Sequence, residues 1–502
     1  MKRIVSVCLA GLAILLAAAS STTAAPPNVV FILTDDLGYA DLGCYGQKII
    51  RTPNLDRMAA EGMRFTQHYS GSPVCAPSRC VLMTGKHTGH AFIRDNRSVK
   101  PEGQYPIPTE TVTLAELFKQ RGYATGAFGK WGLGPMDSTG SPLKQGFDRF
   151  FGYNCQGKAH NLYPPSLWDN DKILSLNNDV PHPPQKLPDG ADPNDPASYK
   201  RFVGKDYAPD LYMEQARRFI RDHKDGPFFL YVPTIIPHVA LQVPDDSLAE
   251  YKGKFSDPPY PGGRGYLPHF APRAAYAAMI TRMDREAGRI MALVKELGLD
   301  GNTVFVFCSD NGPLNGTHQG LAGTDAAFFN SAGGLRDGKG TVYEGGFRVP
   351  CIVRWQGKIA AGTTSERVTG FEDWMPTMMD LIGAADSAPK DVDGISFAPT
   401  LLGKSQEPRP FLYREFPSYG GQQSVRIGDW KGVRQNLMPR GKGKKAQPNL
   451  HIELYNLKDD ISETKDVSAQ HPDIVAKTEK IMREQHTPSA EFPLPALDNL
   501  VK

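Results

Sequence analysis

Cysteine is sparse in this chain, which has seven among its 502 residues. One of them, Cys8, falls in the N-terminal segment, and no two of the others have the CxxC spacing of a zinc site. So few cysteines exclude a disulfide-stabilised scaffold and give no indication of bound zinc. A single disulfide in an oxidising compartment stays open, but the sequence does not assign it. The other cysteines are Cys44, Cys75, Cys80, Cys155, Cys308 and Cys351.

Long apolar runs and an excess of charge are also missing. After the N-terminal segment no apolar run is long enough to span a bilayer, so we expect no transmembrane anchor. The 57 lysines and arginines nearly balance the 54 aspartates and glutamates. A chain this close to neutral does not attract polyanions through its overall field, so a nucleic-acid partner is not expected.

The first 25 residues have the composition of a secretory signal. Lys2 and Arg3 are followed by an apolar run from Ile4 to Ala19 and then by small residues. A positive start, an apolar centre and a small-residue exit are typical of a cleaved export signal. We therefore expect an exported protein, either periplasmic or secreted.

The most informative stretch is residues 75–85, which read CAPSRCVLMTG. If the chain is helical from about Ser78, Cys75 lies at a helix N-terminus, where free N–H groups and the helix dipole favour negative charge. Arg79, one turn on, would point at the same spot. This arrangement suggests chemistry on a phosphate or a sulfate. A buried structural cysteine at an ordinary helix start explains the same residues equally well.

Acidic side chains follow two predicted strands. The apolar residues 28–34 predict a strand that is buried on both faces, and two aspartates come directly after it. Residues 303–309 repeat the pattern and are followed by an aspartate and an asparagine. Oxygen ligands at the carboxyl ends of parallel strands suit a hard cation such as Ca²⁺, although aspartates also form turns. The predicted ligands are Asp35, Asp36, Asp310 and Asn311.

Two lysines and a histidine lie where they can meet an anion. Lys130 lies in a glycine-rich segment after the predicted strand 123–128, and Lys339 lies in the glycine-rich turn that begins at residue 335. His238 comes just after a short apolar strand and is a candidate for general acid or base. Each of these residues has an ordinary structural or solvated alternative when it is considered alone.

Residues 135–224 are rich in Pro, Asn and Asp and show no clear periodicity. We expect loops here, and loops of this length are typically either functional or disordered. Aromatic side chains among amides and charges suit sugar recognition, although such residues also pack loops. Two polar residues shortly after the cysteine motif are added as further substrate contacts. The predicted substrate-binding residues are His160, Tyr163, Trp168, Arg94 and Asn96.

The order of elements predicts an α/β fold, with a large mixed, mostly parallel sheet flanked by helices and a smaller C-terminal α+β domain. From about residue 406 the strands become short and alternating, which is typical of an antiparallel sheet, and a helix follows them. The predicted helices span residues 54–63, 111–121, 273–297, 373–382 and 472–485. The predicted units are a signal at 1–25, a catalytic domain at 26–405 and a C-terminal domain at 406–502.

Together these residues resemble the signature of the type I sulfatases of the alkaline phosphatase superfamily. Residues 75–85 match the family's C-x-P-S-R…T-G motif, and further matches follow the family's order along the chain. They are Asp35-Asp36, Gly129-Lys130-Trp131, His238, Asp310-Asn311-Gly312, Lys339 and Glu344-Gly345-Gly346. The resemblance implies an alkaline phosphatase-like fold, hydrolysis of sulfate esters and, from polysaccharide-degrading members, a sulfated carbohydrate substrate.

The resemblance also implies how the site works. Cys75 would be converted to formylglycine by a formylglycine-generating or sulfatase-maturating enzyme, and a hydroxyl of its hydrate would attack sulfur. Arg79, Lys130 and Lys339 would neutralise charge. His238 or Lys339 would give a proton to the leaving alcohol. A calcium ion would be held by Asp35, Asp36, Asp310, Asn311 and an oxygen of the modified Cys75.

One position departs from the family pattern. Gly132 stands where many members have a histidine, which is assigned to the second hydroxyl of the hydrate. The base that releases sulfate is therefore unassigned, and a subfamily that lacks this group is an equal alternative. The histidines that could substitute are His87, His90, His160 and His318.

Two other functions stay open at this stage. A phosphonate or phosphodiester hydrolase of the same superfamily uses similar groups. A non-catalytic protein that binds sulfated glycans is the other alternative, and it applies if Cys75 stays unmodified. The intact set of Arg79, Lys130 and Lys339 disfavours this second alternative.

Overall fold

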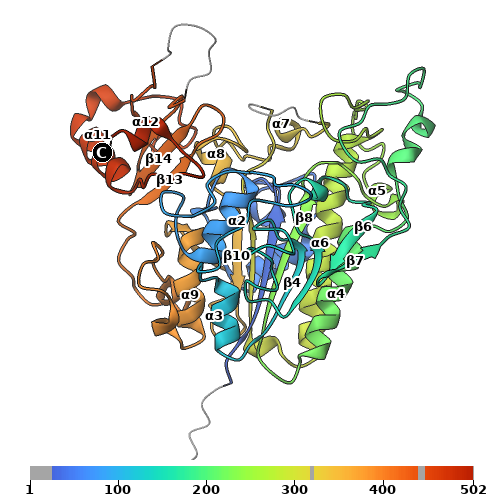
Figure 1. The fold of residues 1–502 in the computed structure, drawn as a ribbon, viewed down its shortest axis with the longest axis horizontal. Coiled ribbons are helices and arrows are strands. Elements are labelled where there is room, and N and C mark those ends of the chain that lie inside the picture. The colour runs from blue at the N-terminus through green and yellow to red at the C-terminus, as the bar shows by residue number, and fades with distance from the viewer. Residues whose placement is uncertain (1–24, 317–321, 439–446, 501–502) are drawn as a thin grey trace, which may run out of the picture.

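The structure is a computed structural model. It describes residues 25–316, 322–438 and 447–500 (Figure 1). Residues 1–24 of the predicted signal, and His318, lie outside the described residues. None of the helices within the described ranges is both long enough and apolar enough to cross a membrane.

A ten-stranded sheet forms the centre of the molecule, and its five middle strands are parallel. In spatial order these are β9 (Thr303–Ser309), β1 (Asn28–Asp35), β8 (Phe228–Pro237), β4 (Ala124–Lys130) and β5 (Arg149–Tyr153). Beyond β9 come β10 (Cys351–Arg354), β2 (Met63–Phe65) and β11 (Thr363–Ser365), and beyond β5 come β6 (Ser166–Asp169) and β7 (Lys172–Ser175). Antiparallel pairs occur only toward the two edges. The prediction of a mixed, mostly parallel sheet is confirmed.

Strand β1 shows why the sheet is covered on both faces. Val30 and Ile32 pack into one hydrophobic core, whereas Val29 and Phe31 pack into the other. Successive side chains of a strand point to opposite faces, so a strand without polar alternation needs an apolar layer on each side. All eight residues of β1 are buried accordingly.

Helices supply these two layers (Figure 1). One face is covered by α1 (Pro53–Ala60), α4 (Ala208–Asp222) and α6 (Pro272–Glu296). The other face is covered by α2 (Cys75–Thr84), α3 (Leu114–Gln120) and α9 (Trp374–Leu381). In Figure 1, α4 and α6 lie on one side of the sheet, and α2, α3 and α9 lie on the other.

Residues 135–224, which the sequence predicts to be rich in loops, contain more regular structure than their lack of periodicity indicated. This stretch contributes the strands β5, β6 and β7 and the fifteen-residue helix α4. The helix begins with Pro209 in its first turn and buries Tyr212, Ala216 and Phe219 against the sheet. Residues four and three apart share one face of a helix, so the pattern of a helix was present in the sequence.

Helix α2 carries the cysteine motif and begins at Cys75 itself, three residues before the predicted start. All ten of its residues are buried. The helix ends at Gly85, whose φ of 69° is left-handed and whose N–H donates to the carbonyl of Val81. Glycine adopts this conformation without a steric cost, which explains the Thr-Gly end of the motif.

A second sheet lies in the C-terminal part of the chain, as predicted. Its four strands are antiparallel throughout, and helix α11 packs against β14. The elements are β13 (Leu412–Phe416), β14 (Gln422–Ile427), β15 (Trp430–Arg434), β16 (Glu453–Asn456) and α11 (Pro472–Glu484). The boundary at residues 405–406 stays a prediction.

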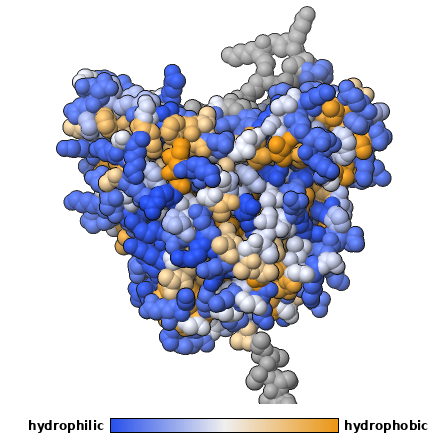
Figure 2. Space-filling model, turned by 180° about the vertical axis from the view of Figure 1, so that it is seen from behind, coloured by the Kyte–Doolittle hydropathy of each residue, from blue (hydrophilic) through white to orange (hydrophobic). Residues whose placement is uncertain are grey.

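Short elements complete the described fold. The pair β3 (His68–Tyr69) and β12 (Thr369–Gly370) is parallel. The short helices are α5 (Asp245–Leu248), α7 (Ala326–Phe329), α8 (Glu344–Phe347), α10 (Ala398–Leu401) and α12 (Pro495–Asp498). The 3₁₀ helices are η1 (Gly43–Tyr45), η2 (Lys158–His160), η3 (Pro196–Phe202), η4 (Asp300–Asn302), η5 (Phe371–Asp373), η6 (Ala385–Ser387) and η7 (Ser468–Gln470). The face opposite to that of Figure 1 is largely hydrophilic, with separate hydrophobic patches (Figure 2).

The chain end is tied back to the molecule by a buried histidine. Nδ1 of His486 lies 2.7 Å from the Glu415 carboxylate on β13, and Nε2 lies 2.9 Å from that of Asp498. The other oxygen of Glu415 accepts a hydrogen bond from Arg94 at 2.8 Å. Burial lowers the pKa of His486, but its two carboxylate partners outweigh burial and raise the pKa above its ordinary value of 6.5.

This shift predicts a stability that depends on pH. A raised folded pKa means that the charged histidine stabilises the fold below the unfolded pKa, and that this stabilisation fades as pH rises through the folded pKa. Replacing His486 by Gln should therefore lower the melting temperature more at about pH 6 than at about pH 9. Thermal unfolding of both proteins at the two pH values measures this, and an equal loss at both would contradict it.

Candidate active site

The carboxyl ends of the middle strands bring the predicted polar residues together. Thr34 on β1 lies beside Ser309 on β9, so the acidic residues that follow each strand become neighbours. On the other side of β1, Asp35 is in register with Pro237, the residue before His238. Strand β4 ends at Lys130. Ligands of open α/β sheets bind at this edge, which is where these side chains meet.

Arg79 reaches this edge from the second turn of α2, one turn after Cys75. Its guanidinium lies 2.8 Å from a carboxylate oxygen of Asp310 and 3.5 Å from one of Asp35. A third N–H donates to the backbone carbonyl of Lys130. The arginine is almost fully buried, so it is held by its partners and not by solvent. Cys75 begins the same helix and is also buried.

Two lysines pair with the remaining carboxylates. Nζ of Lys130 lies 2.6 Å from Asp35, and Nζ of Lys339 lies 2.7 Å from Asp36. All four side chains are buried. Burial raises the pKa of Asp35, but nearby positive charge, that of Lys130 first, outweighs burial and holds the pKa well below its ordinary value.

The negative charge of the three carboxylates, Asp35, Asp36 and Asp310, is nevertheless not fully balanced by the neighbouring cationic side chains. Burial and the neighbouring charge of Asp35 raise the pKa of Asp310 to about 7, despite its contact with Arg79. Oxygen atoms of Asp35, Asp36 and Asp310 lie within 4.8 Å of one another. Close like charges of this kind favour a cation between them.

Two oxygen atoms at the same place support that conclusion. Among the described residues, Oδ1 of Asp35 and Oδ1 of Asn311 are buried and have no hydrogen-bond partner. Nδ2 of Asn311 donates to Asp36 at 2.7 Å, which orients the asparagine toward the carboxylates. Unpaired buried oxygens are rare in proteins and call for an ion or water. The donor set is all oxygen, so it fits a hard cation such as Ca²⁺.

An aromatic layer covers one side of this cluster. Nε2 of His238 lies 3.6 Å from Asp36, and the ring of His160 stacks on that of His238 with centroids 4.8 Å apart. Tyr266 packs edge-on against both rings. Burial first, and then the positive charge of Lys339, hold the pKa of His238 well below its ordinary value, which favours the neutral imidazole.

Tyr266 is a residue that the sequence reasoning missed. Its φ of 56° is left-handed, which is uncommon for a residue with a side chain and often marks a functional site. The only signal in the sequence was an aromatic residue just after Gly262, Gly263 and Gly265. No period or motif accompanies such a loop, so its place beside His160 follows from the tertiary fold.

The predicted substrate contacts divide into two groups. Asn96 lies at the site, because its Oδ1 accepts the N–H of Ala76 at 3.0 Å and its Nδ2 lies 3.9 Å from Sγ of Cys75. His160 also lies at the site, as described above.

The other three predicted contacts have structural surroundings. Tyr163 is buried in the hydrophobic core against Tyr207. The indole N–H of Trp168 donates to Glu102. Arg94 is buried in its pair with Glu415. The structure does not bring these side chains to the cluster, because they are held elsewhere by core packing, a hydrogen bond and an ion pair.

The structure also separates the histidines that could replace the missing one. His87 and His90 lie beyond Gly85, at the opposite end of α2 from Cys75. A ten-residue helix is about 15 Å long, which separates the end of α2 that precedes these histidines from the cysteine. His87 instead contacts Gln485, and His90 contacts Asp393. Of the four candidates, His160 alone lies at the site in the described residues.

Three buried cationic side chains and a cluster of oxygens that could hold a cation, at one end of a parallel sheet, fit a class of enzyme, the hydrolases of negatively charged esters. Fixed positive charge stabilises the charge that develops when such an ester is cleaved, and a bound cation adds to it.

Comparison with known proteins names the family within this class. The protein-family model described as Sulfatase matches residues 27–384. A second family model, of the C-terminal part of N-sulphoglucosamine sulphohydrolase, matches residues 334–487. The chain belongs to the sulfatase family. It is a type I sulfatase and thus a sulfuric ester hydrolase.

Individual relatives agree with this assignment. Arylsulfatase A of Homo sapiens is 35% identical over 426 residues, which cover 80% of this chain and 74% of that protein. N-acetylgalactosamine-6-sulfatase of Rattus norvegicus is 32% identical over 421 residues, which cover 80% and 70%. The crystal structure of Ps i-CgsB in complex with k-i-k-neocarrahexaose is similar with a TM-score of 0.72, 25% identity and 94% of both chains covered.

Proposed function

We propose that this enzyme removes sulfate from a sulfated carbohydrate, with a formylglycine made from Cys75 as the nucleophile and a bound calcium ion. The observation that carries the proposal is the position of Cys75 at the start of α2, with its Sγ within 4.8 Å of ligand atoms of Asp35 and His238. Asp35 in turn pairs with Arg79 and Lys130. The export signal and a formylglycine-generating partner enzyme belong to the same proposal.

Calcium would be bound by the oxygens of four residues and by position 75. When bound, it supplies positive charge that polarises the sulfate group. The unpaired oxygens of Asp35 and Asn311 support this assignment. The protein ligands would be Asp35, Asp36, Asp310 and Asn311.

The chain's own cationic side chains would also act on the sulfate. Lys130 and Lys339 hold buried ammonium groups at fixed positions, so they can stabilise negative charge without reorganising. Arg79 ties the start of α2 to Asp310 and thereby orients position 75. Asn96 holds the N–H of Ala76 and fixes the same turn from outside.

Lys339 is the favoured donor of a proton to the leaving alcohol. Nδ1 of His238 is directed at the carbonyl of Val239, which accepts a hydrogen bond, so this ring nitrogen carries the proton of the neutral imidazole. Nε2 is then an acceptor and has no proton to give. Nζ of Lys339 keeps its protons because the carboxylate of Asp36 opposes the effect of burial and raises the pKa of the lysine.

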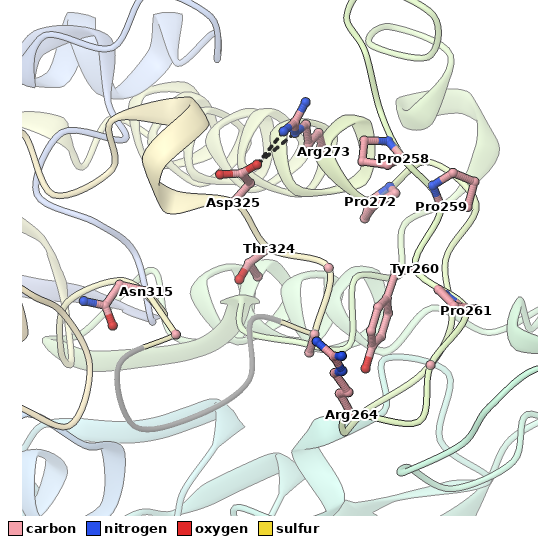
Figure 3. A pocket seen from close by; sticks show the side chains of 14 residues that line it. Pro258, Pro259, Tyr260, Pro261, Arg264, Pro272, Arg273, Asn315, Thr324 and Asp325 are labelled. Carbon is pink, nitrogen blue, oxygen red and sulfur yellow. Dashed lines mark hydrogen bonds and ion pairs between the residues drawn. The ribbon is translucent and has the colours of Figure 1, made fainter.

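The organic part of the substrate would lie in a pocket beside the carboxylates. A cavity of about 720 Å³ is bounded by residues 258–264 and by Asn315 and Thr324 (Figure 3). Thr324 also borders a small cavity that Asp36 lines, so the pocket adjoins the proposed calcium site. Tyr260 and Arg264 offer a ring face and a cation, which suit a sugar that carries anionic groups.

A first test concerns the nucleophile. Mass spectrometry of the peptide that contains Cys75, from protein made in its native host, should show formylglycine in place of cysteine. Cys75→Ala should reduce hydrolysis of p-nitrophenyl sulfate to background, because no other group replaces the attacking oxygen. An unmodified thiol in active protein, or retained activity in the alanine variant, would refute the proposed nucleophile.

A second test concerns the cation. Calcium added to chelator-treated protein should raise the melting temperature. At a calcium concentration of 100 times Kd, binding to the folded state increases the free energy of unfolding by about 2.7 kcal/mol. Asn311→Ala should lose this increase, since it removes an unpaired ligand oxygen. Asp284→Asn, which changes a buried carboxylate that binds Asn54, is the matched control and should keep it. A calcium effect that survives in Asn311→Ala would place the ion elsewhere.

A third test concerns the pocket. Arg264→Ala should raise KM for a sulfated oligosaccharide about ten-fold, which is the loss of affinity expected when one hydrogen bond to a charged group is removed. It should leave KM for p-nitrophenyl sulfate unchanged, because that compound does not extend into the pocket. Arg264→Lys retains the charge, so its KM for the oligosaccharide should lie between those of the wild type and Arg264→Ala. Equal effects on both substrates would argue against a sugar-binding role.

A further inference from the structure

Gly132 stands two residues after Lys130, at the position where many type I sulfatases carry a histidine. Its φ is 88°, and a Cβ placed on it would lie 2.1 Å from Nε2 and 3.0 Å from Cδ of Gln156. The first of these distances is shorter than real Cβ contacts, so a side chain here would have to displace the end of Gln156. The amide group of Gln156 therefore fills the space that a side chain at position 132 would enter.

The backbone holds Gln156 at this place. The N–H of Gly132 donates to the carbonyl of Asn154 at 3.1 Å, so the segment after β5 runs beside the end of β4. The same segment leads within four residues to His160, which stacks on His238. Gln156 thus lies on a segment that runs from the end of β4, which carries Lys130, to the stacked rings of His160 and His238.

The amide of Gln156 is buried but incompletely bonded. Only 6% of the residue is exposed, and Nε2 donates a long hydrogen bond of 3.5 Å to the carbonyl of Gly132. Among the described residues, Oε1 has no hydrogen-bond partner, and neither does Oδ1 of the neighbouring Asn154. Buried acceptors of this kind indicate a group that completes the bond when it is present.

We propose that Gln156 is a positioning residue that replaces the missing histidine. Its Oε1 accepts a hydrogen bond from the hydroxyl that remains on position 75 after sulfate has been transferred to it, and so orients this hydroxyl for the release of sulfate. The inference rests on the proposed function, because it requires a hydrated formylglycine.

The step that Gln156 assists can be written in full. The O–H bond of the remaining hydroxyl breaks, and its oxygen forms the double bond of the aldehyde. The bond between the same carbon and the sulfate oxygen breaks, and its electron pair leaves with sulfate. An amide is not basic, so the proton passes to a water molecule, and Gln156 only fixes the direction of the hydroxyl.

Gln156→Leu removes the acceptor at nearly constant size. We expect kcat for p-nitrophenyl sulfate to fall about 100-fold, the usual cost of a misplaced reacting group, with KM little changed. Sulfate release would become limiting, so the position-75 peptide should carry a sulfo group in protein quenched during turnover. Gln156→Glu keeps an acceptor oxygen and should restore release, so that the sulfo group no longer accumulates.

Gln145→Leu is the matched control. Gln145 is also buried with an unpaired Oε1, but its Nε2 donates to Thr139, near the start of α3 and apart from the site residues. This variant should keep its kcat and show no sulfated peptide. Gln156→Ala, which only deletes atoms, covers the case in which leucine does not fit.

The possible outcomes separate the inference from the proposed function. An unmodified Cys75 in active wild-type protein would defeat both. Formylglycine in the wild type, together with unchanged kcat in Gln156→Leu and Gln156→Ala, would overturn the role of Gln156 alone. A loss of kcat without a sulfated peptide, or an equal loss in Gln145→Leu, would also overturn it.

Discussion

The balance of buried charge at the carboxyl end of the central sheet is the constraint on which the rest of the structure depends. Removing one partner of a buried ion pair costs about 3–5 kcal/mol, so each carboxylate requires a cation nearby. Arg79 meets this requirement for Asp310 and also contacts Asp35 and the carbonyl of Lys130. One guanidinium therefore joins helix α2 to β9, β1 and β4 and fixes Cys75, the proposed nucleophile position, relative to all three strands.

Close backbone contacts explain why glycines surround this cluster. A Cβ on Gly312 would lie 1.8 Å from the carbonyl oxygen of Gly345, so the segment after β9 can approach α8 only without side chains. The N–H of Lys339 donates to the carbonyl of Pro313 in the same region. This contact brings Lys339 to Asp36. The glycines of the family signature thus position a cation and do not act as catalytic groups themselves.

Much of the fold and of the charged cluster could be predicted from sequence, because each depends on local pattern. The apolar runs of β1 and β9 determine strand burial, and their parallel alignment brings the following acidic residues together. Helix α4 was missed because frequent prolines before it concealed its periodicity. The places of Tyr266 and Tyr163 depend on how loops pack over the sheet. No pattern along the chain distinguishes an aromatic residue that lines a site from one that fills a core.

The contrast between strand ends and loops also separates the residues proposed for catalysis from those proposed to bind the substrate. The charged groups come from strand ends and from α2, whose positions are fixed by sheet register and by buried ion pairs. The walls of the adjoining pocket come instead from residues 258–264 and the segment around Thr324, which connect helices and strands (Figure 3). Loops tolerate substitution far better than a buried charge network does. A change of substrate can therefore arise in these loops while the cluster stays intact, so the cluster carries the reaction, and in the proposed function the pocket would select the sugar.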